Sequence, residues 1–345
     1  MNIDVPRVVL VALVLAVVGG FVLGGSTSGV AFDSFNPEWE GTSDLRTTAE
    51  NTGSEPVIVR NTTRYDEYGE GDVAFVLAPT REYDEADADR VRAFVERGGT
   101  LIVADRDGPY GHALLDAVGA EARPEGPILR DERHYHTGPA LPVASNVSNH
   151  SLVDGVESVT LNYGTAVEPN GATVLVTSSA FAYLDLDGSG DVSENETVAS
   201  YPVATVEPVA DGQVVVVGDP SVFINVMQDD VGNQRFVEAL VSQAGTQHTL
   251  VDTTHTASPP PLVSALLTVR ESLFLQLGLA IGALSAVGLS RRALNRRVDA
   301  DDRPSVDDET LADGLAGLNP TLAPDSVRRL TKGIITRRVE GDDDE

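Results

Sequence analysis

Short apolar runs alternate along the chain with segments that have helical spacing. Residues 73–78 form an apolar run bounded by turn residues, which is typical of a buried parallel strand. Residues 84–97 carry apolar side chains on one helical face, and residues 100–104 form a second run that ends at Asp105. Residues 111–118 again have helical spacing. This strand–helix–strand–helix order predicts an α/β class with a doubly wound, mostly parallel sheet.

The middle of the chain predicts further strands. Residues 134–234 contain no Arg or Lys and are rich in β-branched side chains, which favour strands. A last helix is expected over 230–243, where apolar residues return at helical spacing. The expected strands of this part lie at 159–162, 173–177, 198–206 and 213–217, and an earlier strand is expected at 57–59.

Two long apolar runs predict a membrane topology. Residues 8–25 carry no charge and approach the ~20 residues that cross a bilayer, although a cleaved signal peptide is the alternative. Residues 272–290 are also uncharged and precede an Arg-rich segment, and a buried core helix is the alternative there. The sequence therefore predicts two transmembrane helices, both termini in the cytoplasm and the main domain outside the cell membrane.

Glycosylation sequons are consistent with that topology, because all four lie between the two runs. The candidate glycosylation sites are Asn61, Asn146, Asn149 and Asn195. The expected organisation is an anchor or signal peptide at 1–32, an extracellular α/β domain at 33–257, a Pro-rich juxtamembrane spacer at 258–271, a transmembrane helix at 272–290, and a cytoplasmic tail at 291–345 with short helices. The expected partners are the lipid bilayer and a membrane or cytoplasmic protein bound through the tail.

Composition narrows the function classes. The 345 residues include 53 acidic and 24 basic side chains, for a net charge of -29, so no nucleic-acid partner is expected. The absence of cysteine excludes disulfides, zinc–thiolate sites and a cysteine nucleophile. An acidic excess of this size resembles the proteomes of salt-in halophilic archaea, where high salt screens the repulsion.

One acidic segment has the spacing of a calcium loop. Residues 185–196 match the twelve-residue pattern D-x-[DN]-x-[DN]-G-x₅-E, except for a serine at the fifth position. A structural Ca²⁺ would be held by Asp185, Asp187, Ser189, the Asp191 carbonyl, Ser193 and Glu196. The flanks predict strands rather than helices, and an ordinary acidic turn is the alternative. A glycan on Asn195 would crowd the ion.

A second candidate site lies at strand ends. Asp105 and Asp219 directly follow predicted buried strands, where doubly wound sheets place their ligand crevice. Ser221, Asn225 and Asn233 complete the candidate ligand-binding set. Helix capping by Asp219 is the favoured alternative, because Asp219-Pro220-Ser221 is also a typical strand-to-helix turn.

The segment around Asp219 also carries a family resemblance. Together with residues 94–105, it resembles a haloarchaeal family of membrane-anchored proteins of unknown function, whose domain is similar to class I glutamine amidotransferase-like, flavodoxin-type folds. The matching stretch reads Gly212-Gln-Val-Val-Val-Val-Gly-Asp-Pro-Ser-Val-Phe-Ile-Asn225, followed by Asp230, Asn233 and Phe236. The resemblance implies a flavodoxin-like sheet and, through AAA-type ATPases encoded with such proteins, an envelope-assembly role. It transfers no amidotransferase activity, because that chemistry uses a cysteine.

The expected function is therefore a non-enzymatic, membrane-anchored domain that binds a ligand or protein. The alternative is a metal-assisted hydrolase that uses Asp105 and Asp219. No catalytic residues are assigned under the first reading.

Overall fold

The computed structural model describes most of the α/β domain. The described residues are 29–243, 245–256, 264–265, 268–269, 272–283, 285, 325–326 and 329. The chain divides into two compact units, Met1–Thr268 and Val269–Glu345. The predicted anchor at 8–25, the proline run at 259–261 and nearly all of the predicted tail lie outside the described residues.

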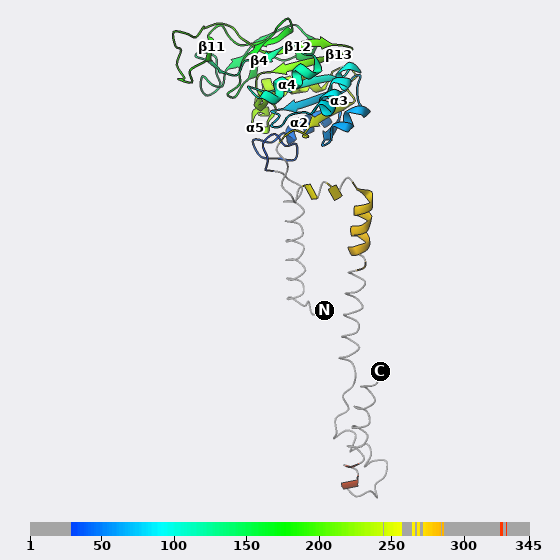
Figure 1. Cartoon of the computed structure of the whole chain (residues 1–345). Helices are drawn as coiled ribbons and strands as arrows, with labels where there is room; N and C mark the ends of the chain where they lie inside the picture. Colours follow the sequence, from blue (N-terminus) through cyan, green and yellow to red (C-terminus); the bar gives the residue numbers. More distant parts are fainter. Residues whose placement is uncertain are drawn as a thin grey trace. The chain divides into compact units, whose positions relative to one another are not determined.

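A large mixed sheet forms the centre of the first unit (Figure 1). Its strand order is β1-β14-β2-β3-β13-β12-β10-β7. Five neighbouring strands are parallel, namely β1 (Glu55–Val59), β14 (His248–Asp252), β2 (Val73–Leu77), β3 (Thr100–Ala104) and β13 (Gly212–Val217). The antiparallel remainder is β12 (Pro202–Val209), β10 (Thr173–Thr177) and β7 (Asn146–Val147). The carboxyl ends of the five parallel strands consequently share one edge.

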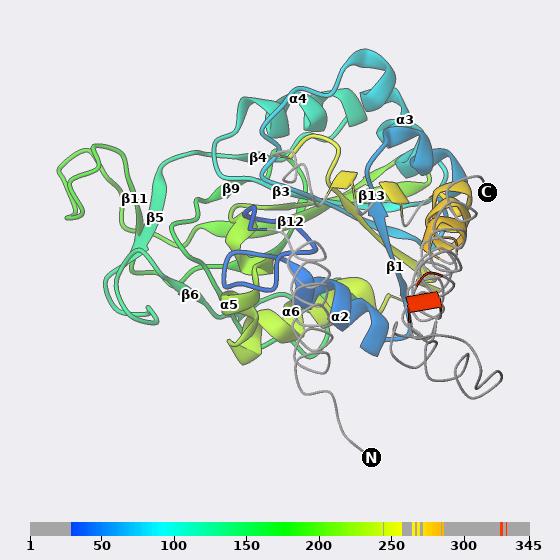
Figure 2. The same ribbon diagram turned by 90° about the horizontal axis from the view of Figure 1, so that it is seen from below.

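Three short ribbons accompany the sheet. They pair β5 (Ile128–Asp131) with β11 (Ala182–Asp185), β4 (Arg123–Pro124) with β9 (Val167–Glu168), and β6 (Val143–Ala144) with β8 (Val159–Thr160). In Figure 2 the β5–β11 ribbon projects from the side of the domain. The candidate calcium loop directly follows β11.

Helices cover both faces of the sheet (Figure 2). One layer contains α2 (Ser43–Asn51), α5 (Asn225–Gln228), α6 (Val231–Val241) and the 3-10 turns η2 (Ser151–Val153) and η3 (Pro220–Phe223). The layer on the opposite face contains η1 (Thr62–Glu67), α3 (Glu85–Glu96) and α4 (Pro109–Val118). Successive side chains of a strand point to opposite faces. On β3, Ile102 therefore packs in one core cluster, whereas Leu101 and Val103 pack in the other. Burial on both faces explains the unbroken apolar runs of β2 and β3.

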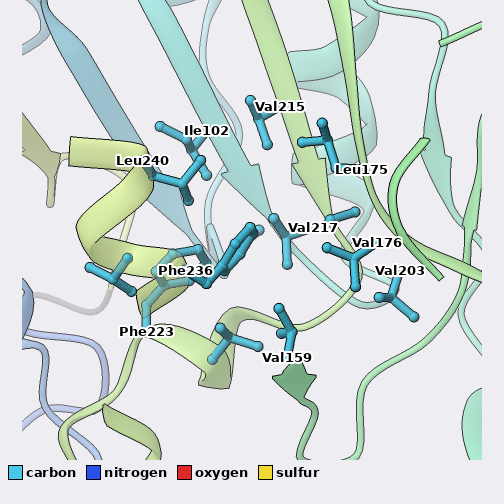
Figure 3. Packing of buried hydrophobic residues seen from close by; sticks show 14 of the residues in the cluster. Ile102, Val159, Leu175, Val176, Val203, Val215, Val217, Phe223, Phe236 and Leu240 are labelled. Carbon is cyan, nitrogen blue, oxygen red and sulfur yellow. The ribbon is translucent and has the colours of Figure 1, made fainter. Parts of the chain in front are cut away.

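Aromatic packing fixes the segment after β13 against the sheet. The ring of Phe223 lies 5.4 Å from that of Phe75 and 6.3 Å from that of Phe236, measured between centroids. Figure 3 shows Phe223 and Phe236 beside aliphatic side chains of the strands, including Ile102 and Val217. The edge-to-face pair of Phe75 and Phe223 contributes about 1 kcal/mol beyond its buried area. This packing holds Asp219 and Ser221, which lie just before Phe223, at the edge of the sheet.

Most core elements lie where the apolar pattern predicts them. The predicted segments 73–78, 100–104, 173–177 and 213–217 form β2, β3, β10 and β13. The predicted helices form α3, α4 and α6. The pattern misses α2 and β14, which contain few apolar residues; of the five residues of β14, only Leu250 and Val251 are strongly apolar.

The predicted fold class needs two corrections. The first concerns the sheet, which is mixed rather than mostly parallel, because β12 turns back beside β13 and continues as an antiparallel meander to β7. The β-branched middle of the chain supplies these strands. Antiparallel strands need only short turns, so no crossover helices separate β12 from β13.

The second correction concerns the membrane. Within the described parts of the chain, no helix has both the length and the apolarity needed to cross a bilayer. Of the predicted second span, the structure describes residues 272–283 and 285. The predicted two transmembrane helices, and the cell-membrane localisation that depended on them, are therefore wrong by this finding.

Candidate functional site

A hollow lies at the carboxyl edge of the parallel strands. Its volume is about 440 Å³. Ala78 follows β2, Asp105 follows β3, and Asp219 follows β13 after one glycine, so three strand ends meet there. The wall also contains Phe32, Arg106, Asp107, Gly108, Asn162, Tyr163, Pro220 and Ser221. Open α/β sheets bind ligands at this edge.

Asp105 lines this hollow, and one of its carboxylate oxygens is buried without a hydrogen bond. The residue is only 6% exposed, and its Oδ1 accepts a hydrogen bond from the Arg106 amide at 2.8 Å. Its Oδ2 is buried and has no hydrogen-bond partner among the described residues. Burial raises the pKa of the Asp105 carboxyl, while backbone amides and the nearby His112 oppose the rise. Asp105 therefore offers a desolvated acceptor that the fold itself leaves unsatisfied.

Glycines make room for that carboxylate at the start of α4. A Cβ atom added at Gly108 or at Gly111 would lie 2.2 Å from Asp105 Oδ2. No side chain fits at either position without displacing the carboxylate, so the two glycines keep Asp105 in place.

Asp219 has a different role, because both of its oxygens are engaged. Oδ1 accepts the Ser221 amide at 2.8 Å and also the Ser221 hydroxyl, and Oδ2 accepts the Asn162 amide at 2.5 Å. Asp219 is the N-cap of η3, which is the alternative that the sequence favoured. Burial raises the pKa of Asp219 to about 6, against the lowering effect of these hydrogen bonds.

The structure places the two predicted asparagines away from the hollow. Asn225 donates to the carbonyls of Asn36 and Glu38 and accepts the Asp44 amide at 3.0 Å, so it holds the start of the domain against α5. Asn233 exchanges two hydrogen bonds with the backbone of Thr160 on β8. Both side chains are buried and stabilise the fold.

Sequence reasoning missed several residues of the hollow. Arg106 and Asp107 could have been found from their position directly after Asp105. Tyr163 and Phe32 gave no signal, because each depends on a backbone conformation with positive φ, 57° and 61°, in an irregular loop. The hollow is therefore built partly by segments without secondary structure.

The candidate calcium loop brings its acidic residues together. One carboxylate oxygen from each of Asp185, Asp187 and Glu196 lies within 4.8 Å of the other two. Hydrogen bonds from Ser189 hold the pKa of Asp187 below its usual value. The Ser189 hydroxyl also donates to the Asp191 carbonyl at 2.9 Å, so these two predicted ligands are adjacent.

All four sequon asparagines are exposed, as glycosylation requires. They are Asn61, Asn146, Asn149 and Asn195. Glycan occupancy stays a prediction, which intact-mass measurement of the protein from its native source would test.

One known protein family matches most of the α/β domain. A family model described as a domain of unknown function, DUF4350, matches residues 34–241, which is more than half of the chain. The chain belongs to the DUF4350 family. The DUF4350 match includes the acidic loop and every lining residue of the hollow except Phe32. No curated protein matches this DUF4350 chain.

Several solved structures are distantly similar to the DUF4350 chain. The mmIFT52 N-terminal domain is 12% identical, with a TM-score of 0.41, over 54% of this chain and 81% of that one. An exo-β-1,4-mannosidase from Opitutaceae bacterium strain TAV5 is 17% identical, with a TM-score of 0.28, over 52% of this chain and 26% of that one. A β-galactosidase from the Antarctic haloarchaeon Halorubrum lacusprofundi is 14% identical, with a TM-score of 0.30, over 60% and 27%. These similarities are too weak to carry an argument about function.

Proposed function

We propose that this protein is a non-enzymatic binding domain that takes a small organic cation in the hollow at the carboxyl edge of its sheet. The observation that carries the proposal is the unpartnered Oδ2 of Asp105, which is buried beside that hollow. Leaving a buried acceptor unsatisfied costs about 1–3 kcal/mol. A ligand that donates a hydrogen bond to this oxygen would recover that cost.

The lining charges favour a cationic donor. The hollow has three carboxyl groups, from Asp105, Asp107 and Asp219, and one guanidinium, from Arg106. Tyr163 is 52% exposed at the rim and offers an aromatic surface. An ammonium group with a short alkyl stem would satisfy Asp105 and place its stem against Tyr163.

Binding is better supported than hydrolysis. A metal-assisted hydrolase would use Asp219 as a ligand or base, but that carboxylate caps η3, and both lone pairs of its Oδ1 are used by the amide and hydroxyl of Ser221. The resemblance to glutamine amidotransferase-like domains does not support an enzyme either. Their chemistry uses a cysteine nucleophile, and this chain has no cysteine. That resemblance, a haloarchaeal origin and an envelope-assembly role linked to AAA-type ATPases stay predictions, and the neighbouring genes would test the last two.

Calorimetric titration of the full chain with n-butylammonium tests the proposal. Tetramethylammonium is the matched probe, because it has the same charge and no N–H donor. We expect saturable binding of butylammonium and at least about tenfold weaker binding of tetramethylammonium, equivalent to 1.4 kcal/mol. Equal affinities would show diffuse attraction to an acidic surface, and the proposal would fail.

Asp105→Asn should separate binding from stability. The variant keeps the shape of the side chain and removes the desolvated charge, so we expect it to raise the free energy of unfolding at neutral pH by about 1 kcal/mol. The same change should weaken butylammonium binding at least about tenfold. Asp211→Asn is the control, because Asp211 is an exposed carboxylate outside the hollow, and its effect on both measurements should be small.

A further inference from the structure

The acidic loop after β11 begins with a buried carboxylate, Asp185, of which one oxygen has no partner among the described residues. Asp185 is 5% exposed, and its Oδ2 accepts hydrogen bonds from Arg130 Nε at 2.7 Å and from the Gly190 amide at 3.2 Å. Its Oδ1 is buried without a hydrogen-bond partner among the described residues. The Asp185 carboxylate lies beside those of Asp187 and Glu196, with one oxygen of each within 4.8 Å of the others.

The spacing of the cluster fits one shared cation. Calcium–oxygen bonds measure about 2.3–2.6 Å, so two oxygens on one ion lie no more than about 5 Å apart. The oxygens of Asp185, Asp187 and Glu196 satisfy this limit, since all lie within 4.8 Å of one another. These three residues are the first, third and twelfth of the loop, the positions from which calcium loops supply carboxylates.

Backbone hydrogen bonds already orient the carboxylates. Glu196 accepts the Leu186 amide on Oε1 at 2.8 Å and the Ser193 amide on Oε2 at 3.0 Å. Asp187 Oδ1 accepts the Ser189 amide at 2.9 Å. Each oxygen retains a second lone pair, so these contacts fix the side chains without exhausting their ability to bind an ion.

The local charge is strongly negative. Residues 185–196 contain five acidic and no basic side chains, and Arg130 is the ion-pair partner described for this loop. One guanidinium cannot balance five carboxylates, and it contacts only one oxygen of Asp185.

We propose that residues 185–196 bind one divalent cation, with calcium preferred, through Asp185, Asp187 and Glu196 and with oxygens of Ser189 and Asp191 nearby. The preference follows from the all-oxygen donor set and from the twelve-residue spacing of the loop, which suits the six to eight ligands of Ca²⁺ better than the strict octahedron of Mg²⁺. The ion joins the start of the loop to its end and closes the tip of the β5–β11 ribbon. This site is separate from the proposed ligand hollow and does not depend on it.

Terbium luminescence gives a direct test. Tb³⁺ takes calcium-type oxygen sites, and a nearby tyrosine sensitises its emission. Tyr183 donates a hydrogen bond to the Gly190 carbonyl at 3.0 Å, so its ring is adjacent to the loop. In the full chain at 1 M KCl, which screens diffuse attraction, we expect saturable Tb³⁺ emission that Ca²⁺ displaces with a Kd of about 10⁻⁵–10⁻³ M and that Mg²⁺ displaces far less well. Absence of saturable, calcium-displaceable emission would overturn the proposal.

Matched variants locate the ion. Glu196→Gln and Asp187→Asn should each weaken Ca²⁺ displacement at least about tenfold. Glu194→Gln is the control, because it removes the same charge from an exposed position of the loop that supplies no ligand. Asp187 is exposed, so its variant should fold even if Glu196→Gln does not. Equal effects of Asp187→Asn and Glu194→Gln would overturn the site, as would emission that Tyr183→Phe leaves unchanged.

Discussion

Replacing Asn225 with alanine is expected to lower the free energy of unfolding by about 3 kcal/mol, because several buried backbone groups lose their partner at once. The Asn225 amide group donates to Glu38 O at 2.6 Å, to Asn36 O at 3.1 Å and to Ser43 Oγ at 3.1 Å. Its oxygen accepts the Asp44 amide in the first turn of α2. Alanine satisfies none of these groups.

Urea denaturation followed by two signals measures this effect. Trp39 is the sole tryptophan, and its carbonyl accepts the Val226 amide at 3.1 Å, so its fluorescence reports on the segment that Asn225 holds. Circular dichroism reports on the whole domain. The neighbouring change Val226→Ala is the control and should cost less than about 1 kcal/mol, because that side chain is 43% exposed. A loss below about 1 kcal/mol for Asn225→Ala would contradict the assigned role.

The second large effect is a pH dependence from Asp219. Its folded-state pKa of about 6 lies above the ordinary value of 3.8, so the folded protein binds this proton more tightly than the unfolded chain does. The stabilisation from protonation is therefore fully present below about pH 4 and is lost as the pH rises through 6. Between pH 4 and pH 8 the change amounts to about 2 kcal/mol for this residue alone.

Comparing the wild type with Asp219→Asn isolates that effect, because the other carboxyl groups titrate in both proteins. We expect the asparagine variant to be less stable than the wild type at every pH, since its NH₂ group faces the Asn162 amide. Its free energy of unfolding should fall below that of the wild type by about 2 kcal/mol more at pH 4 than at pH 8. Ser221→Ala removes a hydroxyl that lowers the pKa of Asp219, so in that variant the transition should move above pH 6. A stability difference independent of pH would contradict the assignment.

The sequence predicts those parts of the fold that local pattern determines. The unbroken runs of β2 and β3 and the helical spacing of α3 identify these elements, because burial on two faces or on one stripe leaves a direct trace in the residue order. β14 leaves no such trace. Its place between β1 and β2 depends on pairing with segments almost 180 residues or more away, which no local pattern encodes.

The candidate site shows the same division. Asp105 and Asp219 lie at the carboxyl edge because they follow strands, and position after a strand is visible in the sequence. Which oxygens lack a partner is not visible in the sequence, because it depends on the Asn162 amide reaching Asp219 while no described group donates to Oδ2 of Asp105. Asn225 and Asn233 have the residue type of a ligand-binding site, but the fold uses their amide groups to satisfy its own backbone.

The apolar runs illustrate the limit of composition. An uncharged run of suitable length predicts a membrane span only if it forms one continuous helix. Within the described parts of the chain, no helix has both the length and the apolarity to cross a bilayer. Apolar composition alone therefore does not establish a membrane span.

The central claim is that the hollow beside Asp105 is a binding site for an organic cation. The most direct measurement is a titration of the isotopically labelled full chain with n-butylammonium, monitored by NMR through the backbone amide signals. The account predicts saturable shifts confined to the amides of residues 105–108 and 162–163, and their loss in Asp105→Asn. Shifts spread over the acidic surface, or shifts that persist in Asp105→Asn, would contradict it.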